Sequence, residues 1–186
     1  MRIAVTVMFV TAFASFTWGM SRFFRRPNGL TRDTALVAVL GLGFTVWDLT
    51  ALLLHAAAQE LLLAAALLLM FSVIIFWRAV RACESMRLTA IFEQDLPRTL
   101  VCQGIYRYVR HPFYLSYTMF WAAGWMASTS VGALAALVVM LTIYARGGWQ
   151  EERKFARSPL AREYASYRNR AGLIFPRLWS RGVTGR

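Results

Sequence analysis

The chain is poor in acidic residues, histidines and cysteines, and these scarcities restrict what it can be. Only nine of its 186 residues are Asp or Glu, against 21 Lys and Arg, so the formal net charge is +12. Its two cysteines, Cys83 and Cys102, lack the spacing of a metal site, and we expect both to be reduced. We therefore expect no metal centre and no disulfide framework.

Apolar residues are abundant instead. They make up 58% of the chain, and the mean hydropathy of +0.47 is too high for a soluble domain of this size. The composition predicts an all-α integral membrane protein, a helical bundle formed as one domain over residues 1–186. In such a protein a positive charge is typical of arginine-rich loops facing anionic lipid, so we expect membrane lipid and no nucleic acid as a partner.

Five apolar segments can cross a bilayer as helices, which takes about 17 to 25 residues. The first could also be a signal peptide, but its apolar run is longer than usual and three arginines follow closely. The last two are short and can span only if their helices extend into the polar flanks or the bilayer thins. The predicted spans are Ile3–Met20, Ala35–Leu54, Leu61–Trp77, Phe113–Met126 and Val131–Tyr144.

The basic residues predict how these spans are oriented. If the chain begins outside, every Lys and Arg except Arg2 lies on the inner side. This is the positive-inside pattern, and it places the turn at Ser21–Asp33, the charged excursion at Arg78–Arg110 and the C-terminal segment in the cytoplasm. We expect a bacterial inner membrane. The start of the excursion, Arg78–Phe92, has the spacing of an extension of the third helix.

One acid, Asp48, lies well inside the second predicted span. A charged side chain there is unfavourable by about 2.5 to 3.5 kcal/mol on insertion scales. Two interpretations stay open. The carboxyl could form a hydrogen bond or provide helix-end polarity near the outer interface, with His55 two turns away, or it could line a substrate cavity.

The densest polar and aromatic stretch is Gly104–Tyr114, which reads Gly-Ile-Tyr-Arg-Tyr-Val-Arg-His-Pro-Phe-Tyr and leads into the fourth predicted span. Arg110 and His111 can hold an anionic group, and the tyrosines offer stacking faces tipped with a hydroxyl. Pro112 suits the first turn of a helix, whose unpaired N–H groups would point toward a bound ligand.

A second polar motif follows the fifth predicted span. Glu151 and Glu152 are adjacent, and Tyr164 and Tyr167 lie on one face of a helix. Taken alone, the glutamates suit a charge balance with nearby basic residues, and the tyrosines suit an interfacial anchor. A hairpin of the last two spans, however, returns this motif to the end of the bundle that carries Gly104–Tyr114. Together the motifs would form a site open to a water-soluble cofactor and a lipid-like substrate.

These residues resemble the integral-membrane methyltransferases that include isoprenylcysteine carboxyl methyltransferase and the phospholipid N-methyltransferases. The resemblance covers about the second half of the chain, so that 78–186 would be the catalytic part and 1–77 three N-terminal spans. It rests on Gly104–Tyr114, on Glu151 and Glu152 one hairpin later, and on Tyr164, Tyr167 and Pro176.

The resemblance implies a cytoplasm-facing pocket for S-adenosylmethionine, and a Rossmann glycine motif is not apparent. It implies catalytic roles for Arg146, which would orient a carboxylate acceptor, and for Glu152, which would deprotonate an amine acceptor. Arg146 is equally well explained as an interfacial arginine. The cofactor-binding residues implied by position are Tyr106, Arg110, His111, Pro112, Tyr114, Leu115, Glu151 and Glu152.

The methyl acceptor stays open between an isoprenylcysteine-type carboxylate, a phospholipid amine and another small apolar molecule. Two features depart from the family pattern. Ser158-Pro159-Leu160 replaces the usual Phe-Gly, and Gly147-Gly148 is expected to interrupt the helix that leads to Glu151. The C-terminal segment is therefore expected to fold differently here.

Two other classes of protein remain open. Sterol reductases carry a similar Arg-His-Pro and tyrosine signature and bind NADPH, so NADPH binding would identify a reductase. A non-catalytic membrane partner would retain the fold without the chemistry. The intact His111 and the glutamate pair argue against that second class.

Overall fold

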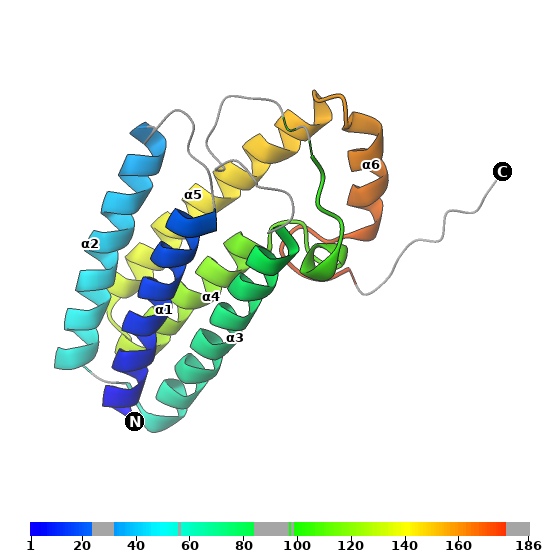
Figure 1. Ribbon diagram of the computed structural model, residues 1–186. Helices are drawn as coiled ribbons and strands as arrows, with labels where there is room; N and C mark the ends of the chain where they lie inside the picture. The colour runs from blue at the N-terminus through cyan, green and yellow to red at the C-terminus, as the bar shows by residue number, and fades with distance from the viewer. Residues whose placement is uncertain (24–31, 56, 84–96, 98, 178–186) are drawn as a thin grey trace.

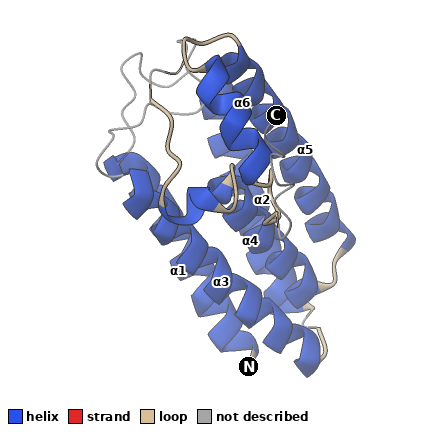
Figure 2. Cartoon of the chain, turned by 90° about the vertical axis from the view of Figure 1, so that its right-hand side faces the viewer, coloured by secondary structure: helices blue, strands red, loops and turns tan. Residues whose placement is uncertain are grey.

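The computed structural model describes residues 1–23, 32–55, 57–83, 97 and 99–177. Over these ranges the chain is all-α, as predicted, with helices and loops only (Figure 2). The N-terminus and α6 lie at opposite ends of the bundle (Figure 1). The elements are α1 (Arg2–Phe23), α2 (Arg32–Leu54), α3 (Gln59–Cys83), the 3-10 helix η2 (Gly104–Arg107), α4 (Pro112–Ser128), α5 (Val131–Ala156) and α6 (Ala161–Arg170).

Each of the five predicted spans forms a helix. Four helices, namely α1, α2 from Thr34, α3 and α5, are long and apolar enough to cross a membrane. The fifth, α4, has 17 residues and rises about 25 Å, slightly less than a hydrocarbon core of about 30 Å. The helices α4 and α5 extend into their polar flanks, as their short apolar runs required. These helices support an integral membrane protein.

The charged regions are described only in part. The extension of the third helix is confirmed as far as Cys83, where α3 ends. The rest of Arg78–Phe92 and most of the turn at Ser21–Asp33 lie outside the described residues.

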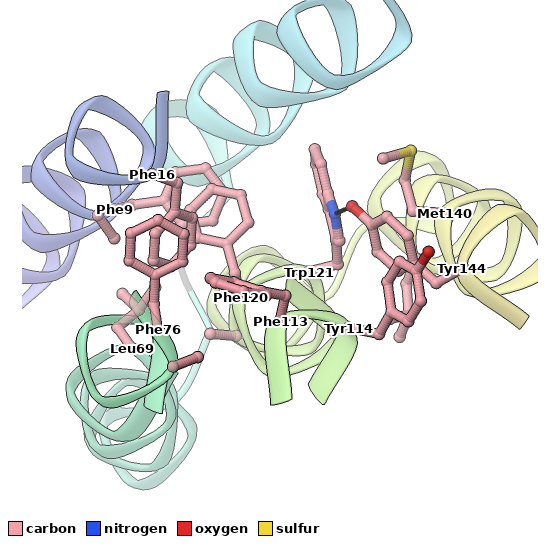
Figure 3. Close-up of a cluster of buried hydrophobic side chains, with 14 of the residues drawn as sticks. Phe9, Phe16, Leu69, Phe76, Phe113, Tyr114, Phe120, Trp121, Met140 and Tyr144 are labelled. Atoms are coloured by element: carbon pink, nitrogen blue, oxygen red, sulfur yellow. Dashed lines mark hydrogen bonds between the residues drawn. The ribbon is translucent and has the colours of Figure 1, made fainter. Parts of the chain in front are cut away.

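Aromatic side chains fill the space between α1, α3 and α4. The helix α1 buries Val5, Phe9, Ala12, Phe16 and Gly19, at intervals of three or four residues. Phe9 stacks on Phe120 of α4 with ring centroids 4.2 Å apart, and Phe16 lies 4.7 Å from Phe76 of α3 (Figure 3). A Cβ at Gly19 would lie 2.6 Å from Phe76, so glycine permits this close contact. Shape matching of this kind is what holds helices together in lipid.

Asp48 lies at the end of the bundle away from α6. It is 2% exposed, and neither carboxyl oxygen has a hydrogen-bond partner among the described residues. Its Oδ2 faces α4 so closely that a Cβ at Gly124 would come within 2.5 Å. His55 is exposed. The hydrogen bond considered for Asp48 is therefore not formed with any described residue.

Candidate functional site

The hairpin of α4 and α5 brings the two polar motifs together. The helix α4 begins at Pro112, as predicted, and α5 begins at the far end of the bundle, where Ser130 Oγ accepts a hydrogen bond from the Ala133 N–H at 3.0 Å. From there α5 runs back along α4 to Ala156, toward α6 (Figure 1). Its last turns place Glu151 and Glu152 beside His111.

Gly147 and Gly148 do not interrupt α5, so that prediction is wrong. A Cβ at Gly147 would lie 2.7 Å from the Tyr114 hydroxyl, and one at Gly148 would lie 3.6 Å from the Tyr114 ring. Glycine at these positions allows the Tyr114 ring to lie against the α5 backbone. Each glycine is unfavourable in a helix by about 1 kcal/mol relative to alanine, but the packing of Tyr114 keeps the helix continuous.

The His111 ring lies between the two glutamates. Its Nδ1 is 3.3 Å from Glu151 Oε2, and its Nε2 is 3.2 Å from Glu152 Oε1. Burial alone lowers the pKa of this ring, but its hydrogen bonds to both carboxylates and their negative charges raise it more, to about 9 from the usual 6.5. The ring is therefore protonated at neutral pH.

Arg110 and Tyr164 complete the surroundings of Glu152. Arg110 donates to Glu152 Oε2 at 2.5 Å, and the Tyr164 hydroxyl donates to Oε1. The side chains of Arg110 and Glu152 are only 11% and 14% exposed. Arg168 approaches from the exposed edge, with its Nε 3.6 Å from Oε2. The Nε–H of Arg110 is buried without a partner among the described residues.

Glu151 is linked to a column of aromatic side chains. It accepts a hydrogen bond from the Tyr114 hydroxyl at 2.7 Å, and Tyr114 stacks on Tyr144 at 5.5 Å. The Tyr144 hydroxyl accepts from Trp121 Nε1 at 3.0 Å (Figure 3). Tyr144 and Trp121 were not among the predicted site residues, although Tyr144 lies one helical turn before Gly147 on the buried face of α5.

Hydrogen bonds to the segment around α6 hold Gly104–Tyr114 in place. The Tyr167 hydroxyl donates to the Tyr106 carbonyl at 2.7 Å. The main-chain N–H groups of Arg110 and His111 donate to the carbonyls of Gly172 and Leu173 at 2.8 and 3.1 Å. These bonds fix the direction in which the two side chains leave the main chain.

The tyrosines of α6 are not an interfacial anchor. Tyr164 and Tyr167 are both buried, with their hydroxyls bonded into the site. The turn before α6 uses Ser158, whose Oγ accepts from the Leu160 N–H at 3.1 Å, so Ser158-Pro159-Leu160 reverses the chain without the Phe-Gly of the family pattern. The C-terminal segment thus reaches the site.

The structure brings most of the predicted site residues together. Tyr106 is buried in η2, where its hydroxyl accepts from Cys83 Sγ at 3.3 Å, and Leu115 lies half-buried one turn along α4 from His111. Pro112 is buried at the start of α4. The residues in direct contact are Arg110, His111, Tyr114, Glu151 and Glu152.

Arg146 is not part of this group. It is exposed, and helical spacing turns it away from the face of α5 that buries Tyr144, Gly147 and Gly148. It forms no hydrogen bond or ion pair with the part of the chain that the structure describes. Its proposed role with a carboxylate stays a prediction.

Comparison with known protein families identifies a match. Residues 60–158, more than half of the chain, match the model of a family described as phospholipid methyltransferase. The matched stretch contains α4, the whole of Gly104–Tyr114 and both glutamates, and it ends before α6. No curated protein matches the chain.

Proposed function

Because the chain belongs to the phospholipid methyltransferase family, we propose that it transfers a methyl group from S-adenosylmethionine to a lipophilic acceptor at the membrane surface. One observation carries this proposal beyond the family. Two glutamates of α5 meet Arg110, His111 and Tyr114 at the end of an apolar helical bundle, where a water-soluble cofactor and a membrane-borne acceptor can meet.

The residues of this group fit the cofactor. The guanidinium of Arg110 suits a carboxylate, and Glu151 and Glu152 suit positively charged groups. Tyrosine faces and Leu115 offer apolar walls for an adenine ring. When bound, the cofactor supplies an electrophilic methyl group on a positively charged sulfur.

The protein itself binds and orients the cofactor and the acceptor, and it excludes water from the site. The hydrogen bonds that the Arg110 and His111 N–H groups donate to the carbonyls of Gly172 and Leu173 hold this main chain in place, and α6 places Tyr164 against Glu152. A ligand held in position reacts faster because it has already lost its translational and rotational freedom on binding. Excluding water from the site strengthens each electrostatic interaction there.

We propose a phospholipid amine as the acceptor. Arg146, the predicted partner of a carboxylate, is exposed and lies outside the group, which favours an amine over a carboxylate acceptor. The family description supports the same class. The test supplies a phospholipid with a primary amine headgroup and a prenylated cysteine, each with methyl-labelled cofactor. Label in the phospholipid is expected, and label in the cysteine derivative alone would contradict the amine.

We also propose that the site faces the cytoplasm of a bacterial inner membrane. The support is the clustering of basic residues on the α6 side of the bundle, with Arg2 at the other end. Reporter fusions at Arg25 and after residue 186 are expected to be cytoplasmic. An external C-terminus would contradict this orientation.

The first test of the function is calorimetric titration of the detergent-solubilised protein with S-adenosylmethionine, S-adenosylhomocysteine and NADPH. Binding of the first two alone is expected. Binding of NADPH alone would indicate a reductase, and binding of none by a sample with intact helical circular dichroism would favour a non-catalytic partner.

A further inference from the structure

His111 has an unusual position between two groups that can only accept hydrogen bonds. Each ring nitrogen lies within 3.3 Å of a different carboxylate. A neutral imidazole has one N–H, whereas an imidazolium has two. The geometry therefore requires an extra proton in the group when no ligand is bound, and His111 holds it.

With that proton the charges of the four buried side chains cancel, while Arg168 adds its charge only at the exposed edge. Arg110 and His111 carry one positive charge each, and Glu151 and Glu152 one negative charge each. All four side chains are less than a quarter exposed, so an uncompensated charge would be poorly screened. A ligand that adds one positive charge beside the glutamates must therefore displace a positive charge that is already present.

Among the described side chains in and around this group, only His111 can give up such a charge near neutral pH. The guanidinium of Arg110 does not deprotonate in proteins, and the same holds for Arg168 at the exposed edge. Burial raises the pKa of the Tyr106 and Tyr164 hydroxyls, so neither releases a proton in this range, and the Tyr114 hydroxyl is engaged as a donor to Glu151. The two glutamates become more firmly ionised when a cation approaches.

We propose that His111 releases its proton to solvent when a cationic ligand binds at Glu151 and Glu152, and regains a proton when the bound ligand is uncharged. The inference rests on the proposed function, because S-adenosylmethionine carries one net positive charge and S-adenosylhomocysteine carries none. His111 thereby lets the site distinguish the charged donor from its neutral product. When a proton returns to His111, the four buried side chains again have no net charge, and S-adenosylhomocysteine is bound less tightly.

The experiment counts protons directly. The whole protein in detergent is titrated with each ligand at pH 7.0 in buffers that differ in ionisation enthalpy, so that the change in observed heat gives the number of protons released. About one proton is expected with S-adenosylmethionine and about none with S-adenosylhomocysteine. By linkage, affinity for the charged ligand is expected to rise close to tenfold from pH 6 to pH 7, with no comparable rise for the neutral one.

A pair of histidine variants locates the proton. His111→Gln is expected to lose both the proton release and the pH dependence. His55→Gln changes the chain's other histidine, which is exposed at the far end of the bundle, and is expected to keep both. If His111→Gln does not fold, the proton counts of the unmodified protein with the two ligands still decide the question.

The outcomes separate this inference from the proposed function. Binding of S-adenosylmethionine without proton release, or equal release with both ligands, would overturn the role of His111 and leave the methyltransferase proposal intact. Release that persists in His111→Gln would also overturn it. A folded protein that does not bind S-adenosylmethionine at all would overturn both proposals.

Discussion

The two ends of the bundle each contain a buried carboxyl group, and the two groups differ in their hydrogen-bond partners. At one end Asp48 has no hydrogen-bond partner in the part of the chain that the structure describes, and it lies against Gly124. At the other end Glu152 is bonded to Arg110, His111 and Tyr164. The first end is held by the fit of shapes, and the second by the pairing of charges.

This difference predicts which substitutions each end tolerates. An unpartnered buried carboxyl is unfavourable, so little electrostatic stability is lost when it is removed. A paired network leaves several groups unsatisfied when one member is removed. We therefore expect stability to depend on side-chain charge at the α6 end and on side-chain volume at the Asp48 end.

The largest effect is expected from Glu152→Gln. It leaves the Arg110 guanidinium without its buried counter-charge and the protonated His111 ring with Glu151 alone, and removing one partner of a buried pair destabilises by about 3 to 5 kcal/mol. S-adenosylmethionine affinity is expected to fall at least about 100-fold, equivalent to about 3 kcal/mol. Thermal unfolding in detergent and calorimetry measure the two effects.

Glu60→Gln is the matched control for that change. Glu60 is exposed in the first turn of α3, at the other end of the bundle, and its replacement is expected to change stability by no more than about 0.5 kcal/mol. An equal loss of stability in the two variants would show that Glu152 contributes no more to stability than an exposed glutamate does.

A pH titration of stability tests the same network without mutation. The pKa of His111 is raised from 6.5 to about 9, so its contribution is full below pH 6.5 and is lost as pH rises through 9. The loss is up to about 3 kcal/mol, from about 1.4 kcal/mol for each pKa unit. Unfolding free energies of the unmodified protein and His111→Gln, compared from pH 6 to 10, are expected to converge at high pH. A difference that stays constant would contradict the assignment.

The two neighbouring glycines of α5 allow a finer test. Gly147→Ala places a Cβ 2.7 Å from the Tyr114 hydroxyl and is expected to break the bond to Glu151, with a loss of about 2 kcal/mol and weaker cofactor binding. Gly148→Ala meets the same ring at 3.6 Å, an ordinary contact, so the helix is expected to be unchanged or up to about 1 kcal/mol more stable. The reverse ranking in thermal unfolding would contradict the packing of Tyr114.

The smallest effect concerns the shape-matched end. Gly124→Ala places a Cβ within 2.5 Å of Asp48 Oδ2 and 3.0 Å of Phe9, and is expected to reduce stability by about 1 to 2 kcal/mol without changing cofactor affinity. Combining it with Asp48→Ala is expected to give less than the sum of the two losses, because the clash is removed. Additive losses would mean that the two positions do not share this contact.

The sequence was sufficient for most of the fold. Long apolar runs specify membrane helices because lipid offers no partner to an open main chain, and each run became a helix. The charged flanks were harder to read, because helices such as α5 continue beyond the apolar region. Gly147 and Gly148 suggested a break by local propensity, and only the contact with Tyr114, distant in sequence, explains why the helix continues.

The site was predictable where its residues belong to the two polar motifs of the sequence. Arg110, His111 and the two glutamates could be grouped because a hairpin must return to its starting end. The inward direction of Tyr164 and Tyr167 could not be derived, since helical spacing shows that they share a face but not what covers it. Arg146 failed to join the group for a related reason, because its place on α5 depends on helical phase and not on proximity in sequence.

The bond between the Tyr167 hydroxyl and the Tyr106 carbonyl joins residues 61 positions apart in the chain. The acceptors of the Arg110 and His111 N–H groups, Gly172 and Leu173, also lie beyond α6. A chain that stopped before α6 would contain η2, α4 and α5 but would lack every one of these bonds. The membrane helices alone therefore do not hold Arg110 and His111 in place.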